Sequence, residues 1–458
     1  MQGQHEGLFN QSMLDKYGMS GPRYTSYPTA LEFNTEFTDR EFRKAALLAA
    51  NPELAIYIHV PFCHSLCYYC GCNKIITRNR DKIAQYVDYL KKEIILRSEL
   101  FKNHHVIQIH FGGGTPGMLS LEEVKDILST IKSHYKLDEL PEISLEIDPR
   151  ETTVEYISGL AFLGVNRISM GVQDTDKQVQ IAINRIQPTE LVSRLSAGAK
   201  TAGIKSINLD LVYGLPLQTS PGFEQTIEDV LNINPDRISL FNYAHMPQKF
   251  AAQRKIKDSW LPGPEDKLKL MRLAIERFTE AGYRMIGIDH FAKPDDELAI
   301  ALDEKRLGRN FQGYTTLQYT DLVGFGVSAI SSVCNVYSQN SKNPVDYYQM
   351  LDEQQHAIER GLVKSEEDQL RGYIITHLMT NLRLDVEDVE ELFEVSFAEH
   401  FKTELVLLKT FEEDNLIKMT EQAIIVNPDS RLLLRSICMV FDQYMAKHKA
   451  AQRFSKVV

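Results

Sequence analysis

Six short β-rich runs, each followed by a longer stretch with helical spacing, constrain the fold of this chain more than any other feature. Repeated strand and helix units of this kind predict a mainly parallel sheet with helices on its outside. Right-handed crossovers curl such a sheet into a full or partial barrel, and chemistry gathers at the carboxyl ends of its strands. We therefore predict an α/β fold with a partial (β/α)6, TIM-like barrel. The runs are residues 54–60, 106–111, 143–147, 167–172, 207–212 and 237–243, and residues 284–288 offer one further strand.

The pattern becomes mainly helical after about residue 340. Ser365 and Asp368 have the spacing of a helix cap, and two short apolar runs, 416–419 and 423–426, predict a hairpin. A winged-helix module would have this order of elements, but without a basic surface we favour a packing domain. We predict an N-terminal extension over the active site at 1–50, a catalytic barrel at 51–340 and a helical domain at 341–458. Three helices are expected: one with Leu370, Tyr373, Ile374 and Leu378, one with Phe397, Phe401, Leu405 and Leu408, and one with Ile437, Phe441 and Tyr444.

Charge and hydropathy exclude several classes of protein. Lys and Arg total 51 against 62 Asp and Glu, a net charge of -11, which argues against binding to nucleic acid or to an anionic membrane. The apolar runs are much shorter than the ~20 residues that a membrane helix needs, so we expect no membrane insertion. Residues 1–10 lack the basic and apolar regions of a secretory signal, and we therefore expect a cytoplasmic location.

Four of the six cysteines lie within ten residues, in the segment HVPFCHSLCYYCGCNK that follows the first predicted strand. Disulfide frameworks spread their cysteines over small secreted domains, so a local cluster in a long chain indicates metal binding. Cys63, Cys67 and Cys70 form the pattern C-x3-C-x2-C, and Cys72 follows closely. Four cysteines could instead hold a structural zinc ion, although zinc sites usually take their ligands from two separated pairs.

Three thiolates on a four-iron cluster leave one iron without a protein ligand. This spacing is the signature of the radical S-adenosylmethionine (SAM) superfamily, in which the amino and carboxylate groups of SAM bind that iron. Electron transfer from the cluster then cleaves SAM to a 5′-deoxyadenosyl radical. The resemblance implies that the predicted barrel is of the radical SAM type.

Two further motifs fall at predicted strand ends. FGGGTP, residues 111–116, permits close backbone approach to a ligand and matches the superfamily segment that holds the methionyl amino group. Glu146 and Asp148 end the third predicted strand, where a carboxylate can accept hydrogen bonds from ribose hydroxyls. Either carboxylate could instead cap the next helix.

A more specific resemblance extends from about residue 14 to the C-terminus. The chain resembles the oxygen-independent coproporphyrinogen III oxidases of haem biosynthesis. Gly117 departs from the family pattern, which usually has Thr or Ser after GGGTP. The segments that carry the resemblance are PRYTSYPTA from residue 22, MGVQD from 170, NR at 184–185, NLDLVYGLP from 208, FNYAHMP from 241, GIDHFA from 287 and FQGYTT from 311.

From their chemistry alone, Arg185 and Asp210 suit the carboxylate and ammonium of a methionine moiety, although a salt bridge between them is the competing interpretation. The resemblance implies the following roles for residues of this chain. Tyr57, Cys72 and Ile330 are assigned to catalysis, with Cys72 outside the cluster ligands. The [4Fe-4S] cluster is assigned Cys63, Cys67 and Cys70, its SAM is assigned Tyr57, Tyr69, Gly113, Glu146 and Ile330, and a second SAM is assigned Gly114, Thr115, Gln173, Arg185, Asp210 and Ala244.

The implied reaction converts two propionates of coproporphyrinogen III to vinyl groups with loss of carbon dioxide, giving protoporphyrinogen IX. The protein orients the substrate, excludes water and neutralises carboxylates. Implied partners are the porphyrinogen and an electron donor such as flavodoxin or ferredoxin, and we expect a monomer. Related haem chaperones share the cysteine loop, but Cys72 and the segment from residue 22 accompany the oxidases. Candidate partners of the propionates are Arg23, Arg254, Lys255 and Arg309.

Overall fold

The computed structural model describes residues 10–18 and 21–449. Two compact units account for these residues, and each is described separately. Unit 2 comprises Phe33–Ala274 and Thr320–Val363. Unit 1 holds the described residues up to Glu32, together with Ile275–Tyr319 and the residues from Lys364 onward. The domain limits expected from the sequence stay a prediction.

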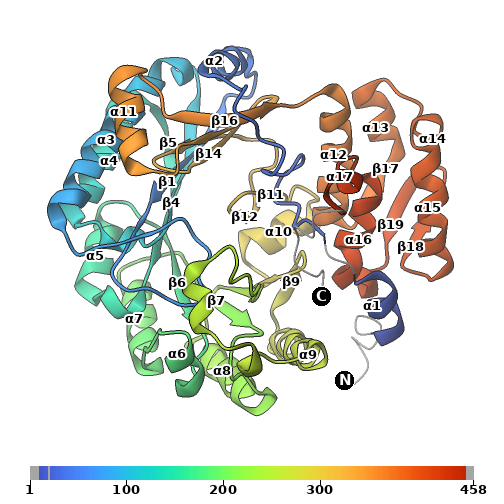
Figure 1. Ribbon diagram of the computed structural model, residues 1–458, viewed down its shortest axis with the longest axis horizontal. Helices are drawn as coiled ribbons and strands as arrows, with labels where there is room; N and C mark the ends of the chain where they lie inside the picture. The colour runs from blue at the N-terminus through green and yellow to red at the C-terminus, as the bar shows by residue number, and fades with distance from the viewer. Residues whose placement is uncertain (1–9, 19–20, 450–458) are drawn as a thin grey trace. The chain divides into compact units, whose positions relative to one another are not determined.

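Unit 2 contains the parallel sheet, and all six predicted runs are strands in it (Figure 1). The strands lie in chain order, β1-β4-β5-β6-β7-β8, and each pairs in parallel with the next. Because the order within the unit is linear, the barrel is open, and the predicted α/β class with a partial barrel is confirmed. The strands are β1 (Glu53–Val60), β4 (His105–Gly113), β5 (Lys136–Ile147), β6 (Arg167–Gln173), β7 (Ser206–Tyr213) and β8 (Arg237–Asn242).

On its other side β1 pairs in parallel with β13 (Asp321–Phe325), a strand that the sequence pattern did not predict. All five of its residues are buried, but the run is short and contains Asp321 and Gly324, so it lacks the apolar signal of the other parallel strands. Antiparallel strands β14 (Ile330–Val333), β15 (Val336–Asn340) and β16 (Ile358–Val363) extend the sheet beyond it.

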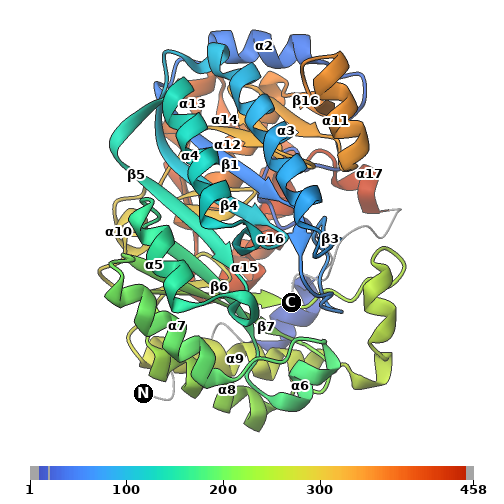
Figure 2. The same ribbon diagram turned by 90° about the vertical axis from the view of Figure 1, so that its left-hand side faces the viewer.

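Helices cover the outer side of this sheet, as Figure 2 shows for α3, α4, α5 and α7. Three of them begin where a side chain satisfies free backbone N–H groups: Asn79 accepts from Lys82 N at α3, Ser120 forms a capping box with Glu123 at α4, and Thr153 accepts from Tyr156 N at α5. Short strands β2 (Phe62–Cys63) and β3 (Ile75–Ile76) pair within the cysteine loop. The helices of unit 2 are α2 (Asp39–Leu48), α3 (Arg80–Ser98), α4 (Leu121–His134), α5 (Val154–Phe162), α6 (Lys177–Ala182), α7 (Thr189–Thr201), α8 (Ser220–Ile233) and α11 (Pro344–Glu353), and α9 (Pro264–Glu280) crosses the unit boundary.

The C-terminal part of unit 1 confirms the first predicted helix and the hairpin. α12 (Glu366–Asn381) starts at a capping box of Ser365 and Asp368, and Leu370, Ile374 and Leu378 are buried along it. The two apolar runs form the antiparallel strands β18 (Ile417–Met419) and β19 (Ala423–Val426). Beside them lie β17 (Arg383–Asp385) and α13 (Val386–Phe393).

Two other helices predicted as continuous are broken. The second ends at Phe401, whose backbone (φ -103, ψ 26) leaves helical geometry and separates α14 (Phe397–His400) from α15 (Lys402–Glu413). In the third, Asp442 adopts an extended conformation and its carboxylate accepts from Tyr444 N at 2.9 Å, so the chain turns there. That segment is α16 (Leu434–Cys438), a 3-10 turn (Met439–Phe441) and α17 (Met445–Lys449).

The rest of unit 1 contains the additional strand suggested at 284–288. It is β9 (Arg284–Ile286), which pairs in antiparallel fashion with β10 (His290–Ala292). Ile286 and Ala292 belong to a small apolar core that includes buried residues of α10 (Glu297–Asp303). Unit 1 also holds α1 (Gln11–Tyr17) and the hairpin of β11 (Gly308–Asn310) and β12 (Gly313–Thr315).

Candidate active site

The cysteine loop leaves the carboxyl end of β1 and is anchored to the segment that follows α6. Tyr68 N donates to Ile183 O at 2.9 Å, and the Asn184 amide donates to Leu66 O at 2.8 Å. Thr77 N donates to Cys63 O at 3.1 Å, so the loop is also tied back on itself. The position of Cys67 between the two anchors on the α6 side is therefore set by backbone hydrogen bonds.

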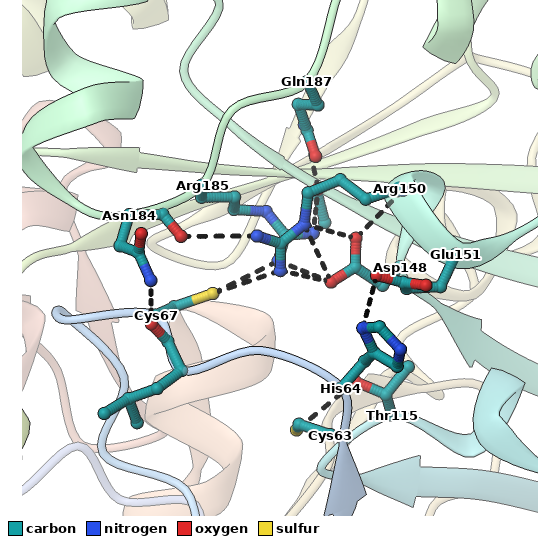
Figure 3. Close-up of polar contacts among 12 residues, drawn as sticks. Cys63, His64, Cys67, Thr115, Asp148, Arg150, Glu151, Asn184, Arg185 and Gln187 are labelled. Carbon is teal, nitrogen blue, oxygen red and sulfur yellow. Dashed lines mark hydrogen bonds and ion pairs between the residues drawn. The ribbon is translucent and has the colours of Figure 1, made fainter. Parts of the chain in front are cut away.

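Each predicted cluster ligand accepts a hydrogen bond at its sulfur, an interaction that stabilises a thiolate and tunes a cluster bound to it. Thr115 Oγ1 lies 3.4 Å from Cys63 Sγ, and Cys72 N lies 3.4 Å from Cys70 Sγ. Two guanidinium groups face Cys67 Sγ, from Arg150 at 3.4 Å and Arg185 at 3.5 Å (Figure 3). This set of three thiols, each with its own donor, fits a cluster held by three cysteines.

Cys72 interacts with Cys70 in a way that distinguishes the two thiols. A hydrogen bond from the Cys72 side chain is the main cause of a lowered Cys70 pKa, and the same bond raises the pKa of Cys72. Lys74 Nζ donates to Cys70 O at 3.0 Å and adds positive charge there. Cys70 is thus the better thiolate of the pair, which agrees with the expectation that Cys72 is not a cluster ligand.

The glycine segment packs against the base of this loop with no room for side chains. A Cβ on Gly113, whose φ is +119°, would lie 2.7 Å from the His59 ring. One on Gly114 would lie 2.8 Å from the Pro61 backbone. The backbone of GGGTP can therefore approach a ligand of the cysteine loop as closely as the motif predicts.

Glu146, at the end of β5, lies beside this segment. Gly113 N donates to its carboxylate at 3.3 Å, and His110 Nε2 lies 3.2 Å from its other oxygen. The Tyr57 ring stacks on His110 with 5.8 Å between centroids, and its hydroxyl lies 3.0 Å from His59 Nδ1. Burial lowers the pKa of His59, which favours the neutral imidazole. The two histidines had not been singled out by sequence pattern.

Ile330 begins β14, which is separated from β1 by one strand, β13. Tyr57 on β1 is paired in register with Gly324 on β13. A Cβ on Gly324 would lie 2.6 Å from Ile330 O, so only glycine permits this close approach. Two of the three residues assigned to catalysis, Tyr57 and Ile330, therefore lie on strands β1 and β14, which flank β13 in the sheet.

The residues assigned to the second SAM lie on loops and strands of unit 2. Gln173 ends β6 in a left-handed conformation (φ 69°). Asp210 on β7 accepts from Asn208 at 2.7 Å and from Ser169 at 3.1 Å. The side-chain amide of Gln253 donates a hydrogen bond to Tyr69 O at 2.9 Å and to Ala244 O at 3.2 Å. It thereby connects two residues that are predicted to contact different SAM molecules. The roles of all these residues stay predictions.

Arg185 forms an ion pair with Asp148 at 3.1 Å, a contact that the sequence did not indicate. Asp148 also binds Arg150, with 2.6 Å between Nη2 and Oδ2. Burial alone would raise the pKa of Asp148, but Arg185 and Arg150 lower it below its ordinary value. The carboxylate thus pairs with two guanidinium groups, and its suggested role toward ribose hydroxyls stays a prediction. Arg185 Nε is buried and has no partner within the described part of the chain, so it can donate to a bound carboxylate.

The four basic candidates for the propionates are divided between the units. Arg254 and Lys255 are exposed residues of unit 2, and Lys255 Nζ lies 5.5 Å from the centre of the Tyr68 ring. Arg309 belongs to unit 1, where it lies 4.4 Å from the Tyr314 ring and 3.9 Å from Asp289. Arg23, also in unit 1, contributes to a lowered pKa of Asp289. Their roles toward the propionates stay predictions.

Among residues 10–18 and 21–449, no three His, Cys, Asp or Glu side chains are grouped so as to hold one metal ion. Within the same ranges, no helix has both the length and the apolar character needed to cross a membrane.

Comparison with known proteins agrees with this fold. The family model of the radical SAM superfamily matches residues 57–230, and that of the HemN C-terminal domain matches residues 365–433. The chain is 46% identical to the oxygen-independent coproporphyrinogen III oxidase of Escherichia coli (strain K12), over 98% of each chain. It is 44% identical to the enzyme of the same name from Pseudomonas aeruginosa, over 98% of this chain and 99% of that one. The solved coproporphyrinogen III oxidase (HemN) from Escherichia coli, described as a radical SAM enzyme, superposes with a TM-score of 0.90, covering 93% of this chain and 100% of the other.

The barrel, the cysteine loop and the family match define a radical SAM enzyme, a class that binds a [4Fe-4S] cluster and SAM. At the next level, the chain belongs to the family of oxygen-independent coproporphyrinogen III oxidases. Its identity to oxidases over nearly the whole chain separates it from the haem-chaperone alternative.

Proposed function

We propose that this chain carries out the oxygen-independent oxidative decarboxylation of coproporphyrinogen III in haem biosynthesis. Two propionate side chains become vinyl groups, two molecules of carbon dioxide leave, and the product is protoporphyrinogen IX. The observation that carries this proposal is the 46% identity to the Escherichia coli oxidase over 98% of the chain. The three thiols, each with its own hydrogen-bond donor, support the proposal because they suit an iron-sulfur cluster held by three cysteines.

The cluster ligands in this proposal are Cys63, Cys67 and Cys70. When bound, the reduced cluster and SAM supply a carbon-centred radical that can remove a hydrogen atom from a propionate β-carbon. Loss of carbon dioxide and transfer of one further electron to an external one-electron acceptor then give the alkene. The contacts proposed for the SAM at the cluster are Tyr57, Tyr69, Gly113, Glu146 and Ile330.

A second SAM is proposed beside the first. The free Nε of Arg185 and the oxygens of Asp210 can receive a carboxylate and an ammonium group. Arg185 is held at this position by Gly171 O, which accepts from its Nη2 at 2.6 Å. The remaining contacts proposed for this molecule are Gly114, Thr115, Gln173 and Ala244.

The other residues of the site act by position. Tyr57, stacked on His110, presents a rigid aromatic surface, and Ile330 adds an apolar one that excludes water. Cys72 is proposed to act in turnover, with its thiol beside Cys70. The exposed Arg254 and Lys255 offer positive charge to propionates, and Arg23 and Arg309 are the corresponding candidates of unit 1.

Finer aspects of the proposal concern partners and location. We propose a monomeric protein that works in the cytoplasm and receives electrons from flavodoxin or ferredoxin. The net charge of -11 is compatible with a freely diffusing protein. Light scattering coupled to size-exclusion chromatography measures the oligomeric state, and turnover with each reduced donor tests the electron source.

One labelling experiment tests the reaction itself. The anaerobically reconstituted protein is given SAM, a reductant and coproporphyrinogen III deuterated at the β-positions of the reacting propionates. Deuterium should appear in 5′-deoxyadenosine, and two vinyl groups should form per porphyrinogen. The Cys67→Ser variant serves as the control and should give neither product. Vinyl formation without SAM, or label found only in water, contradicts the proposal.

A further inference from the structure

Arg150 lies at the site, although neither the sequence patterns nor the family resemblance assigned it a role. It follows β5 in a 3-10 turn (Pro149–Glu151) whose cap is Asp148. Its side chain is 14% exposed and contacts Cys67 through Nη2, Asp148 through Nε and Nη2, and Asn184 O through Nη1 at 3.3 Å. A flexible arginine is thus fixed at three points, and one of them is the sulfur of a proposed cluster ligand (Figure 3).

The charges around Cys67 do not cancel. Arg150 and Arg185 both donate to its sulfur, and the single carboxylate of Asp148 bridges the two guanidiniums. Two positive charges against one negative leave an excess of one positive charge on this side of the cluster site. Glu151 pairs with His64 instead, with 2.9 Å between Oε1 and Nδ1, and among the described residues no ion pair joins it to Arg150 or Arg185.

The other two ligands face the ammonium group of Lys74, which donates to Cys70 O at 3.0 Å, instead of two guanidinium groups. Cys63 accepts from the hydroxyl of Thr115, and Cys70 accepts from a backbone N–H. Charged donors form stronger hydrogen bonds than neutral ones. The hydrogen bonds and nearby charges at cluster sulfurs set the reduction potential of an iron-sulfur cluster.

We propose that Arg150 is a charge-balancing and positioning residue that raises the reduction potential of the [4Fe-4S] cluster through Cys67. Reduction adds one electron to the cluster, and a fixed positive charge stabilises that added negative charge. The electron comes from the donor that the proposed reaction already requires. Asp148 opposes this effect, because it partly neutralises both guanidiniums.

The inference rests on the proposed cluster site, and the experiments distinguish failure of the cluster site from failure of the inference. Iron and sulfide analysis of wild type and Cys67→Ser tests the site alone. The potential of the one-electron couple is then measured in the full-length, reconstituted protein without SAM or substrate. Electron paramagnetic resonance during an anaerobic redox titration provides this readout, which a purely structural role of Arg150 would not change.

Substitutions at two positions give opposite expected shifts. Arg150→Gln removes the charge and should lower the equilibrium constant for reduction about tenfold, equal to about 59 mV for one electron. Arg150→Lys keeps the charge and should stay close to wild type. Asp148→Asn should shift the potential upward. Arg167→Gln is the matched control, since Arg167 pairs with Glu142 at 2.7 Å near the amino end of β6.

Every outcome decides the inference. A wild-type potential in Arg150→Gln with full iron and sulfide content overturns it, and so do equal shifts in the Gln and Lys variants. If Arg150→Gln binds no cluster, the decision falls to Asp148→Asn, in which an unchanged or lowered potential overturns the inference. A shift in Arg167→Gln as large as that in Arg150→Gln also overturns it. If wild type binds no cluster, the proposed function fails first.

Discussion

Replacing Asp174 by Asn should change how the stability of unit 2 depends on pH. Asp174 follows β6, is fully buried, and accepts hydrogen bonds from Gln218 Nε2 at 2.6 Å, Asp176 N at 2.7 Å and Thr226 Oγ1 at 3.0 Å. Burial raises its pKa to about 6, although these hydrogen bonds act in the opposite direction. No cation is among these partners, so the carboxylate is stabilised by dipoles alone.

The sign and size of the effect follow from linkage. Because the native pKa lies above the unfolded value of about 3.9, the native state holds the proton more tightly between about pH 4 and 6. The stabilisation is therefore fully present below about pH 4 and is lost as pH rises through about 6. A difference of roughly 2 pKa units corresponds to about 3 kcal/mol in total, of which about 1.3 kcal/mol is lost between pH 5 and 7.

Trp260 is the single tryptophan of the chain and belongs to unit 2, so its fluorescence reports urea unfolding of that unit. Its carbonyl accepts from Leu217 N at 2.7 Å, next to Gln218 of the Asp174 network. Asp174→Asn should lack the loss of about 1.3 kcal/mol between pH 5 and 7, even if an amide facing Gln218 lowers its overall stability. Asp266→Asn, which removes an exposed carboxylate, should keep the wild-type slope. Parallel slopes for wild type and Asp174→Asn would refute the reasoning.

Three further predictions concern the cluster and SAM sites. Gly113→Ala should lower the free energy of urea unfolding of unit 2 by about 1–3 kcal/mol more than Gly203→Ala does. Both glycines have positive φ, but of the two only Gly113 lacks space for a Cβ. Equal losses of unfolding free energy in the two variants would contradict this. The cluster should be lost in each of three variants, Cys63→Ser, Cys67→Ser and Cys70→Ser, whereas Cys72→Ser should keep four irons and lose turnover. Iron and sulfide analysis and Mössbauer spectroscopy measure the cluster content of all four variants. Loss of iron from Cys72→Ser would count against the proposed ligand set. Equilibrium dialysis should find two SAM per wild-type chain and one in Arg185→Ala, and one in both would remove the second site.

The fold was largely predictable because buried parallel strands are continuous apolar runs. β1 and β7 have at most two residues each that are not fully buried, and such runs stand out in a sequence. The same reasoning could not find β13, since five residues with an aspartate and a glycine carry no such signal. Nor could it find the helix breaks at Phe401 and Asp442, because apolar spacing continues across both. Local backbone and side-chain hydrogen bonds decided those positions.

The candidate site was predictable where its residues are neighbours in sequence. Cys63, Cys67 and Cys70 supply their own spacing, and residues 111–116 supply theirs. The contact between Arg150 and Cys67 joins residues 83 positions apart, so no local pattern contains it. Tyr57 and Ile330 likewise share one sheet only because β13 pairs with both β1 and β14.

Strand order explains why these distant groups converge on one thiol. The loop that carries Cys67 follows β1, Asp148 and Arg150 follow β5, and Arg185 follows β6 and α6. All three strands are parallel and lie within four consecutive places in the sheet, so the segments after them leave from the same edge. A charge placed after β5 thereby faces a ligand placed after β1, and the excess positive charge at Cys67 is a consequence of this topology. The same order makes Arg150 a sharper probe than Arg185, because Arg150 contacts Cys67 without being assigned to SAM.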